Sequence, residues 1–208
     1  MNFTLPKIYP ITDVSLSGMS HAEQVERLIA GGAKFIQLRE KHASPRDFFE
    51  AAKSAVEIAR QHDVKIIIND RVDIARALGA DGVHLGQVDL PPSAARQILG
   101  SEAIIGFSTH SVEQAIKAAA HGVNYIAIGP IFETTTKEKP DPVVGLDGLR
   151  KVKKSIDQIQ LVAIGGIGLD DIRDVMAAGA DSAALISAIV GDSETISVKT
   201  AQFLNIVK

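Results

Sequence analysis

KIIIND, at residues 65–70, joins a short apolar run to an amide and a carboxylate. Two other apolar runs end in a similar way: Phe35–Leu38 continues into Arg39-Glu40-Lys41, and Ile126–Ile128 continues into Gly129-Pro130. A buried strand does not need charged residues or glycine at its end. Such residues are typical of the carboxyl ends of parallel strands in a (β/α)8 barrel, where the βα loops build the active site on one face. Their placement therefore predicts both a barrel and a functional site.

Strand-like and helix-like segments alternate along the chain, as they do in repeated βα units around a parallel sheet. The predicted strands are Lys7–Thr12, Phe35–Glu40, Lys65–Asp70, Gly82–Gln87, Ala103–His110, Tyr125–Pro130, Leu161–Gly166 and Ser182–Ser187. The predicted helices are Ala22–Ala30, Pro45–His62, Val72–Leu78, Pro92–Leu99, Val112–His121, Gly145–Ser155, Leu169–Ala178 and Thr195–Ile206. Eight units of each kind predict a single (β/α)8 TIM barrel that forms one domain over residues 1–208.

A short pattern recurs between predicted helices and strands. Its copies are Gly32-Ala33, Gly79-Ala80-Asp81, Gly122-Val123-Asn124 and Gly179-Ala180-Asp181. A glycine just past the last helical turn is expected at such junctions. The one long loop covers residues 133–144, and a long loop in a compact domain is often a functional lid.

Composition narrows the function to small-molecule chemistry. The chain has 208 residues, 46% of them hydrophobic, no cysteine and a net charge of −3. These values exclude a disulfide and a thiolate nucleophile, and they give no electrostatic case for a nucleic-acid or membrane-surface partner. No apolar stretch approaches the roughly 18 residues of a membrane span, and residues 1–12 lack the regions of a signal peptide. We expect a cytoplasmic protein with small-molecule partners, and the sequence is compatible with a homo-oligomer without defining one.

The first candidate site lies at the end of the second predicted strand. Gln37, Arg39 and Lys41 are spaced two residues apart, so all three side chains point to the same side. The planar guanidinium and the compact ammonium together suit a phosphate or diphosphate. The alternative is a solvated salt-bridge cluster of Arg39, Glu40 and Lys41.

The second candidate site combines Asn69 and Asp70 with Asp89, which follow the third and fourth predicted strands. Oxygen ligands without histidine or cysteine suit a hard ion such as Mg²⁺ that also contacts substrate phosphates. In the alternative interpretation, Asp70 caps the helix that begins near Val72, and Asp89 caps the helix near Pro91. Because Asp70 and Asp89 share a position at one barrel mouth, we favour the interpretation as a metal site over that as two helix caps.

The third candidate site consists of Ile164-Gly165-Gly166-Ile167, after the seventh strand, and Ile186-Ser187, after the eighth. Barrels often bind a phosphate at this place through backbone N–H groups and a short helix N-terminus. The glycines could instead serve only to permit tight turns.

The fourth candidate site is Thr134-Thr135-Thr136-Lys137, whose hydroxyls and ammonium can close over an anionic ligand. A plain threonine-rich turn is the alternative. Ser108 and His110 add donors at the end of the fifth strand, although His110 could be a satisfied structural group. We interpret His84, inside the fourth strand, as structural.

Six motifs in this order resemble those of the thiamine phosphate synthase family. They are Gln37-Leu-Arg-Glu-Lys41, Ile67-Ile-Asn-Asp70, Gly82-Val-His-Leu-Gly-Gln-Val-Asp89, Ser108-Thr-His110, Gly129-Pro-Ile-Phe-Glu-Thr-Thr-Thr-Lys137 and Ala163-Ile-Gly-Gly-Ile167. The resemblance spans essentially the whole chain, and six ordered motifs are far more specific than any one. One position departs from the pattern, because Val88 stands where the family often has an acidic residue.

The resemblance implies that 4-amino-2-methyl-5-(diphosphooxymethyl)pyrimidine is joined to a thiazole phosphate, with release of pyrophosphate. The family's reaction is a dissociative substitution that depends on Mg²⁺. By motif, the pyrimidine diphosphate would be held by Gln37, Leu38, Arg39, Glu40, Lys41, Asn69, Ser108 and Lys137. The thiazole phosphate would be held by Thr134, Thr135, Thr136, Gly166, Ile186 and Ser187, and Mg²⁺ by Asp70 and Asp89. The catalytic residues implied are Arg39, Lys41, Ser108 and Lys137.

Three other interpretations remain open at this point. A thiazole tautomerase-like enzyme shares the fold and binds thiazole phosphate, but it tends to lose the Asn-Asp pair and the second aspartate, which stand here as Asn69, Asp70 and Asp89. An epimerase or isomerase barrel would need a proton-transferring pair, which we do not find in the sequence. A non-catalytic barrel that binds thiamine precursors would hold both phosphates without producing pyrophosphate.

Overall fold

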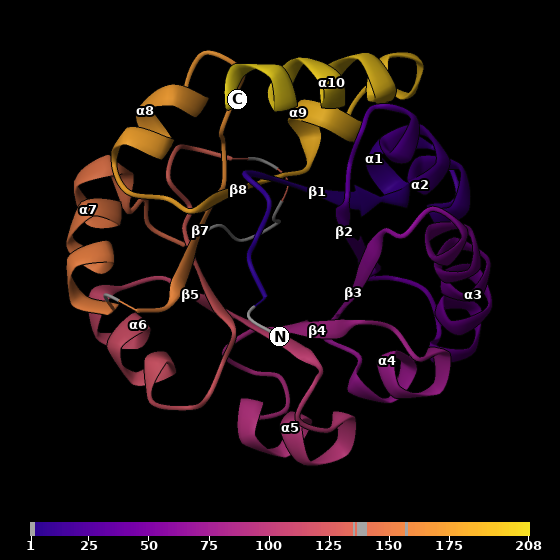
Figure 1. The fold of residues 1–208 in the computed structure, drawn as a ribbon, viewed down its shortest axis with the longest axis horizontal. Coiled ribbons are helices and arrows are strands. Elements are labelled where there is room, and N and C mark those ends of the chain that lie inside the picture. The colour runs from indigo at the N-terminus through magenta and orange to yellow at the C-terminus, as the bar shows by residue number, and fades with distance from the viewer. Residues whose placement is uncertain (1–2, 135, 137–140, 157) are drawn as a thin grey trace.

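The structure, a computed structural model, describes residues 3–134, 136, 141–156 and 158–208. Eight strands form a closed barrel in sequence order, and every neighbouring pair is parallel, including β8 with β1. In Figure 1 the strands form an inner ring and the helices surround it. The prediction of a (β/α)8 TIM barrel is confirmed.

Each strand is followed by at least one helix. The strands are β1 (Ile8–Asp13), β2 (Phe35–Arg39), β3 (Lys65–Asn69), β4 (Gly82–Leu85), β5 (Ile104–Thr109), β6 (Tyr125–Ile128), β7 (Gln160–Ile164) and β8 (Ser182–Leu185). The helices are α1 (Val14–Ser17), α2 (His21–Ala30), α3 (Pro45–Gln61), α4 (Val72–Leu78), α5 (Pro92–Leu99), α6 (Val112–Ala119), α7 (Gly145–Ile156), α8 (Ile172–Ala177), α9 (Ser187–Val190), the 3-10 helix η1 (Ser193–Thr195) and α10 (Ile196–Ile206). In the described parts of the chain, no helix has both the length and the apolar character needed to cross a membrane.

Several strands end earlier than the sequence predicts. β4 ends at Leu85 and β8 at Leu185, two residues before the predicted ends, because the residues beyond them leave the sheet to line the barrel mouth. The N–H of Gly86, for example, donates to the Asp89 carboxylate (2.7 Å) and not to a neighbouring strand. The helix predicted from Leu169 begins at Ile172 instead.

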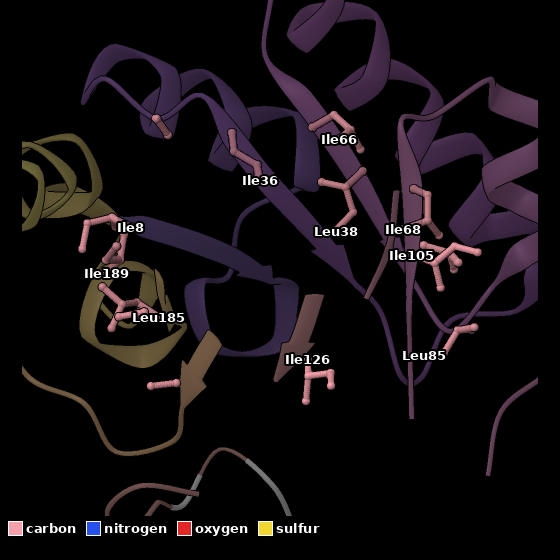
Figure 2. Packing of buried hydrophobic residues seen from close by; sticks show 14 of the residues in the cluster. Ile8, Ile36, Leu38, Ile66, Ile68, Leu85, Ile105, Ile126, Leu185 and Ile189 are labelled. Carbon is pink, nitrogen blue, oxygen red and sulfur yellow. The ribbon is translucent and has the colours of Figure 1, made fainter. Parts of the chain in front are cut away.

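Two apolar layers hold the barrel together. Side chains that point outward pack between strands and helices, and Figure 2 shows Ile36 and Leu38 of β2 beside Ile66 and Ile68 of β3 in this layer. Side chains that point inward form a second cluster, which includes Tyr9, Phe35, Ile67, Tyr125 and Val162. This alternation follows from the two-residue period of a strand. Because both layers are closed by apolar side chains, polar groups that face the interior gather at the carboxyl ends of the strands.

One glycine makes room for a large side chain inside the barrel. A Cβ atom at Gly106 on β5 would lie 2.0 Å from the Cζ atom of Tyr125 on β6. The Tyr125 ring, fully buried, fills this space. The absence of a side chain at Gly106 thus lets an aromatic ring cross the interior of the barrel.

Three of the four copies of the recurring helix-to-strand pattern end in a side chain that forms a hydrogen bond with a neighbouring strand. Asp81, Asn124 and Asp181 accept hydrogen bonds from the N–H groups at or near the start of β3, β5 and β7, at 2.9, 2.9 and 2.8 Å. Each of these side chains also contacts a cation, from Lys65, Arg96 and Lys153 respectively. The pattern therefore closes the amino-terminal end of the barrel, on the side opposite the predicted site.

We predict that Asp181→Ala lowers the free energy of unfolding by roughly 1–3 kcal/mol, because it leaves the N–H of Leu161 and the ammonium of Lys153 without their carboxylate partner. Denaturant unfolding followed by circular dichroism measures this loss. Asp147→Ala is the matched control, since the Asp147 side chain is 88% exposed and forms an ion pair with Arg150, three residues away. Its effect should stay within about 0.5 kcal/mol. Equal losses in the two variants would contradict the structural role of Asp181.

Candidate active site

A cavity of about 570 Å³ opens at the carboxyl ends of the strands, and all eight strands or the loops that follow them contribute to its lining. Its size is that of a small-molecule site. Most of the predicted site residues line it: Gln37, Arg39, Lys41, Asn69, Asp70, Asp89, Ser108, Thr134, Thr136, Gly166, Ile186 and Ser187. The four candidate sites of the sequence thus meet in one cavity.

The side chains of Leu38 and Glu40 do not line this cavity, which corrects the expectation that all of residues 37–41 face a ligand. Leu38 is fully buried in the outward layer, because strand alternation turns it away from Gln37 and Arg39. Glu40 Oε1 instead accepts hydrogen bonds from the N–H groups of His42 (2.8 Å) and Ala43 (3.1 Å). Thr135 and Lys137 lie outside the described residues.

The cations of β2 pair with carboxylates of neighbouring strands. Arg39 bonds to Asp13 at the end of β1, and Lys41 bonds to Asp70 after β3. The alternative interpretation, in which Arg39, Glu40 and Lys41 form a solvated cluster among themselves, therefore does not describe the structure. Asp13 is held in turn, because its side chain accepts from the N–H of Leu16 and its own N–H donates to Gln24.

Asp70 and Asp89 lie close together at the mouth, and neither caps a helix. The N-cap positions of α4 and α5 are Arg71 and Pro91, and neither helix has a side-chain cap. Asp70 has a left-handed backbone (φ 62°), a conformation that aspartate tolerates better than most residues and that is often found at functional sites. Burial, followed by the negative charge of Asp70, raises the pKa of the Asp89 carboxyl, although the hydrogen bond from Gly86 opposes this shift.

This pair of carboxylates fits a hard divalent cation. Two like charges in contact are unfavourable without a cation, and the charge of Asp70 adds to burial in raising the pKa of Asp89. Among the described residues, no group of three or more His, Cys, Asp or Glu side chains converges on one point. A bound Mg²⁺ would therefore take Asp70 and Asp89 from the protein and the rest of its ligands from water and substrate phosphates, as Mg²⁺ commonly does.

Asn69 carries a buried hydrogen-bond donor that is unpaired within the described part of the chain. The residue is only 6% exposed, and its Nδ2 atom has no hydrogen-bond partner among the described residues. A buried amide without a partner costs free energy unless a ligand or water completes it. Asn69 lines the cavity, but its Nδ2 atom is itself buried, so this unpaired donor lies beside the cavity and is not exposed to it.

The floor of the cavity contains residues whose role the sequence did not indicate. His84, interpreted as structural, is buried and lines the cavity, and its Nε2 atom lies 2.8 Å from Ser108 Oγ. Its Nδ1 atom lies 3.0 Å from the hydroxyl of Tyr125, which in turn contacts Tyr9. His110 is also partnered, through Nδ1 to the carbonyl oxygen of Gly129 (2.7 Å). Tyr9 and Tyr125 could not be found from local sequence, since each looks like an ordinary core aromatic.

The loops after β6 and β7 pack main chain against main chain. The N–H groups of Ile131 and Phe132 donate to the carbonyl oxygens of Ile164 (2.9 Å) and Gly165 (3.0 Å). A Cβ atom at Gly166 would lie 2.4 Å from the carbonyl oxygen of Glu133. Gly166 also has a positive φ of 68°. The glycine therefore permits a turn and a close approach of two loops, and its main chain faces the cavity.

The fold and the cavity define a (β/α)8-barrel protein with a small-molecule site at the barrel mouth. The sequence matches the family model described as thiamine monophosphate synthase over residues 8–189, and the chain belongs to this family. The resemblance stated from the motifs is confirmed. Family membership makes the chain a transferase of thiamine biosynthesis that acts on small-molecule substrates.

Similar proteins agree with this assignment. A thiamine-phosphate synthase of Chloroflexus aurantiacus is 45% identical over 185 residues, which cover 88% of this chain and 85% of the relative. A thiamine-phosphate synthase of Clostridium novyi is 46% identical over 189 residues, which cover 90% of this chain and 92% of the relative. The solved structure of thiamine phosphate pyrophosphorylase from Pyrococcus furiosus superposes with a TM-score of 0.87 at 39% identity, covering 97% of this chain and 95% of that one.

We predict that Gly166→Ala destabilises the protein more than Gly122→Ala does. Both glycines have φ 68°, so each alanine carries the same left-handed strain of about 1–2 kcal/mol. Only the Gly166 variant also places a Cβ atom against the β6–α7 loop, because nothing lies within 4 Å of a Cβ atom at Gly122. The extra loss should be about 1–3 kcal/mol in denaturant unfolding, the usual cost of overpacking. Equal losses would mean that the two loops separate freely.

Proposed function

We propose that this chain joins 4-amino-2-methyl-5-(diphosphooxymethyl)pyrimidine to a thiazole phosphate and releases pyrophosphate. The bond between the pyrimidine methylene carbon and the diphosphate oxygen breaks, and a bond from that carbon to the thiazole nitrogen forms. The observation that carries the proposal is that cations and carboxylates lie together at one barrel mouth: Arg39 at the end of β2, Lys41 after β2, Asp70 after β3 and Asp89 after β4. Such a site suits a diphosphate that leaves together with a divalent cation.

Asp70 and Asp89 are the residues that would hold Mg²⁺. When bound, the ion would neutralise the negative charge that grows on the departing diphosphate. Two contacts in the structure support this assignment. The ammonium of Lys41 already balances Asp70, and burial together with the neighbouring charge of Asp70 raises the pKa of Asp89.

The chain's own cations stabilise the leaving group. Arg39 offers a planar guanidinium group and Lys41 a compact ammonium group, and both line the cavity at the carboxyl end of β2. Because both are paired with carboxylates, they are held in place before a substrate arrives, which reduces the reorganisation needed during the reaction. Ser108 supplies a neutral donor, Asn69 lines the cavity, and Gln37 lies deeper in the cavity beside Tyr9.

The thiazole phosphate occupies the other side of the mouth. There Thr134 and Thr136 contribute hydroxyls, while Gly166 and residues 186–187 contribute main chain. Thr135 and Lys137 remain predictions from the motif, with Lys137 assigned to the leaving diphosphate. The thiazole nitrogen attacks with a lone pair and carries no proton, so the reaction needs no general base. The protein positions two substrates and stabilises charge.

The tautomerase-like and non-catalytic alternatives differ from this proposal in their products. Neither releases pyrophosphate. The test is therefore the rate of pyrophosphate release when the purified chain is given Mg²⁺ with both substrates, compared with either substrate alone. Release that requires both substrates supports the proposal, and no release above the background without protein contradicts it.

We predict that Lys41→Gln slows the single-turnover rate of pyrophosphate release on the order of 10²-fold, the usual effect of removing one charge-stabilising donor. Lys65→Gln is the matched control, because Lys65 also forms an exposed pair with an aspartate, Asp81, but at the amino-terminal end of the barrel. Its rate should equal that of the wild type. A Lys41 variant as fast as the control would show that this ammonium does not act on the leaving group.

A further inference from the structure

A continuous chain of polar side chains crosses the interior of the barrel below the cavity. It runs from Gln37 Nε2 to Tyr9 Oη (2.8 Å), to Tyr125 Oη (2.9 Å), to His84 Nδ1 (3.0 Å), and from His84 Nε2 to Ser108 Oγ (2.8 Å). Four strands, β1, β2, β4 and β6, supply its first four members, and β5 supplies Ser108. Both ends of the chain line the cavity.

The burial of this chain restricts how its protons can be arranged. Tyr9 and Tyr125 are 1% and 0% exposed, and His84 is 7% exposed. Each hydroxyl has one proton, so a hydroxyl that donates to one neighbour in the chain must accept from the other. Buried polar groups pair their donors and acceptors, because an unpaired one costs about 1–3 kcal/mol. The hydrogen bonds between these side chains must therefore all point in the same direction, either from Gln37 towards Ser108 or from Ser108 towards Gln37.

Two arguments show that the hydrogen bonds run from Gln37 towards Ser108. The amide nitrogen of Gln37 faces Tyr9 Oη, so Tyr9 accepts there and donates its own proton to Tyr125. Tyr125 must then donate to His84 Nδ1. A phenol is also a stronger acid than an aliphatic alcohol, so of the two hydroxyls that contact His84, that of Tyr125 is the better donor. Both arguments place the imidazole proton on Nε2.

The ionisation states of the chain members agree with this arrangement. Burial raises the pKa of Tyr9 and of Tyr125, so both remain phenols near neutral pH. Burial lowers the pKa of His84 to about 4, so its ring carries a single proton. A neutral ring has one donor nitrogen and one acceptor nitrogen, and the neighbours decide which is which.

We propose that Tyr125 and His84 are positioning residues. Tyr125 fixes the tautomer of His84 that carries its proton on Nε2, and this N–H donates to Ser108 Oγ. The Ser108 hydroxyl proton is thereby turned into the cavity, where it is a donor for the bound substrate. Since Ser108 Oγ accepts a hydrogen bond from His84, the proton of the Ser108 hydroxyl is not used between these side chains. It points to the cavity that Ser108 lines. The inference rests on the proposed function for the identity of the substrate. The tautomer itself does not depend on that function.

The tautomer is measured by nuclear magnetic resonance on ¹⁵N-histidine-labelled protein without substrates. The wild type should show a pyrrole-type Nε2 and a pyridine-type Nδ1 for His84. Tyr125→Phe removes the hydroxyl but keeps the ring that fills the space beside Gly106, and it should leave a mixture of the two tautomers. Tyr9→Phe is the matched control, because it removes the hydroxyl that bonds to Tyr125 but leaves the Tyr125 phenol beside His84 Nδ1. Since a phenol is the better donor to the ring, the Nε2–H form should persist. An Nδ1–H or doubly protonated ring in the wild type would overturn the proposal, as would an unchanged ring in Tyr125→Phe.

The positioning role is measured by a double-mutant cycle on pyrophosphate release. Tyr125→Phe should slow single turnover about tenfold, the equivalent of one hydrogen bond. In a Ser108→Ala background the same change should have no further effect, because Tyr125 acts through the serine hydroxyl. Equal effects in both backgrounds would assign Tyr125 a merely structural role and overturn the proposal. If the wild type releases no pyrophosphate, the proposed function fails, whereas the tautomer measurement still decides the arrangement of the chain.

Discussion

The two-residue period of a parallel strand in a closed barrel is the constraint on which this structure depends. On β2 it turns Ile36 and Leu38 outward against the helices, as Figure 2 shows, and it turns Gln37 and Arg39 inward. The inward layer is closed by aromatic and aliphatic side chains. Polar side chains are tolerated only where the strands end or where hydrogen bonds satisfy them, so the fold itself concentrates the reactive groups at one mouth.

Charge at that mouth is balanced before any ligand binds. Arg39 is paired with Asp13 and Lys41 with Asp70, while Asp89 lies beside Asp70 with a raised pKa. An incoming diphosphate would therefore meet cations that carboxylates already hold in place. This arrangement favours binding of an anion together with a divalent cation, because the divalent cation compensates the negative charge of the diphosphate and of Asp70 and Asp89.

Sequence patterns predicted the elements that depend on local periodicity and the residues that stand at strand ends. Gln37 and Arg39 were placed correctly in the cavity because alternation along β2 decides their side, and Lys41, two residues past the end of β2, lines the cavity from the loop. The side chain of Leu38 points away from the cavity, because a contiguous motif does not follow the alternation of side chains along a strand. The short helices α1 and α9 have too few residues for a periodic signal, and the contacts among Tyr9, His84 and Tyr125 join positions up to 116 residues apart, which no local pattern encodes.

The central claim is that this mouth binds the leaving diphosphate together with a divalent cation held by Asp70 and Asp89. Calorimetric titration of the purified chain with inorganic pyrophosphate, in the presence and absence of Mg²⁺, tests it most directly. The account predicts binding at one site that requires Mg²⁺ and that Asp89→Asn weakens. Binding of equal strength without Mg²⁺, or binding that Asp89→Asn leaves unchanged, would contradict it.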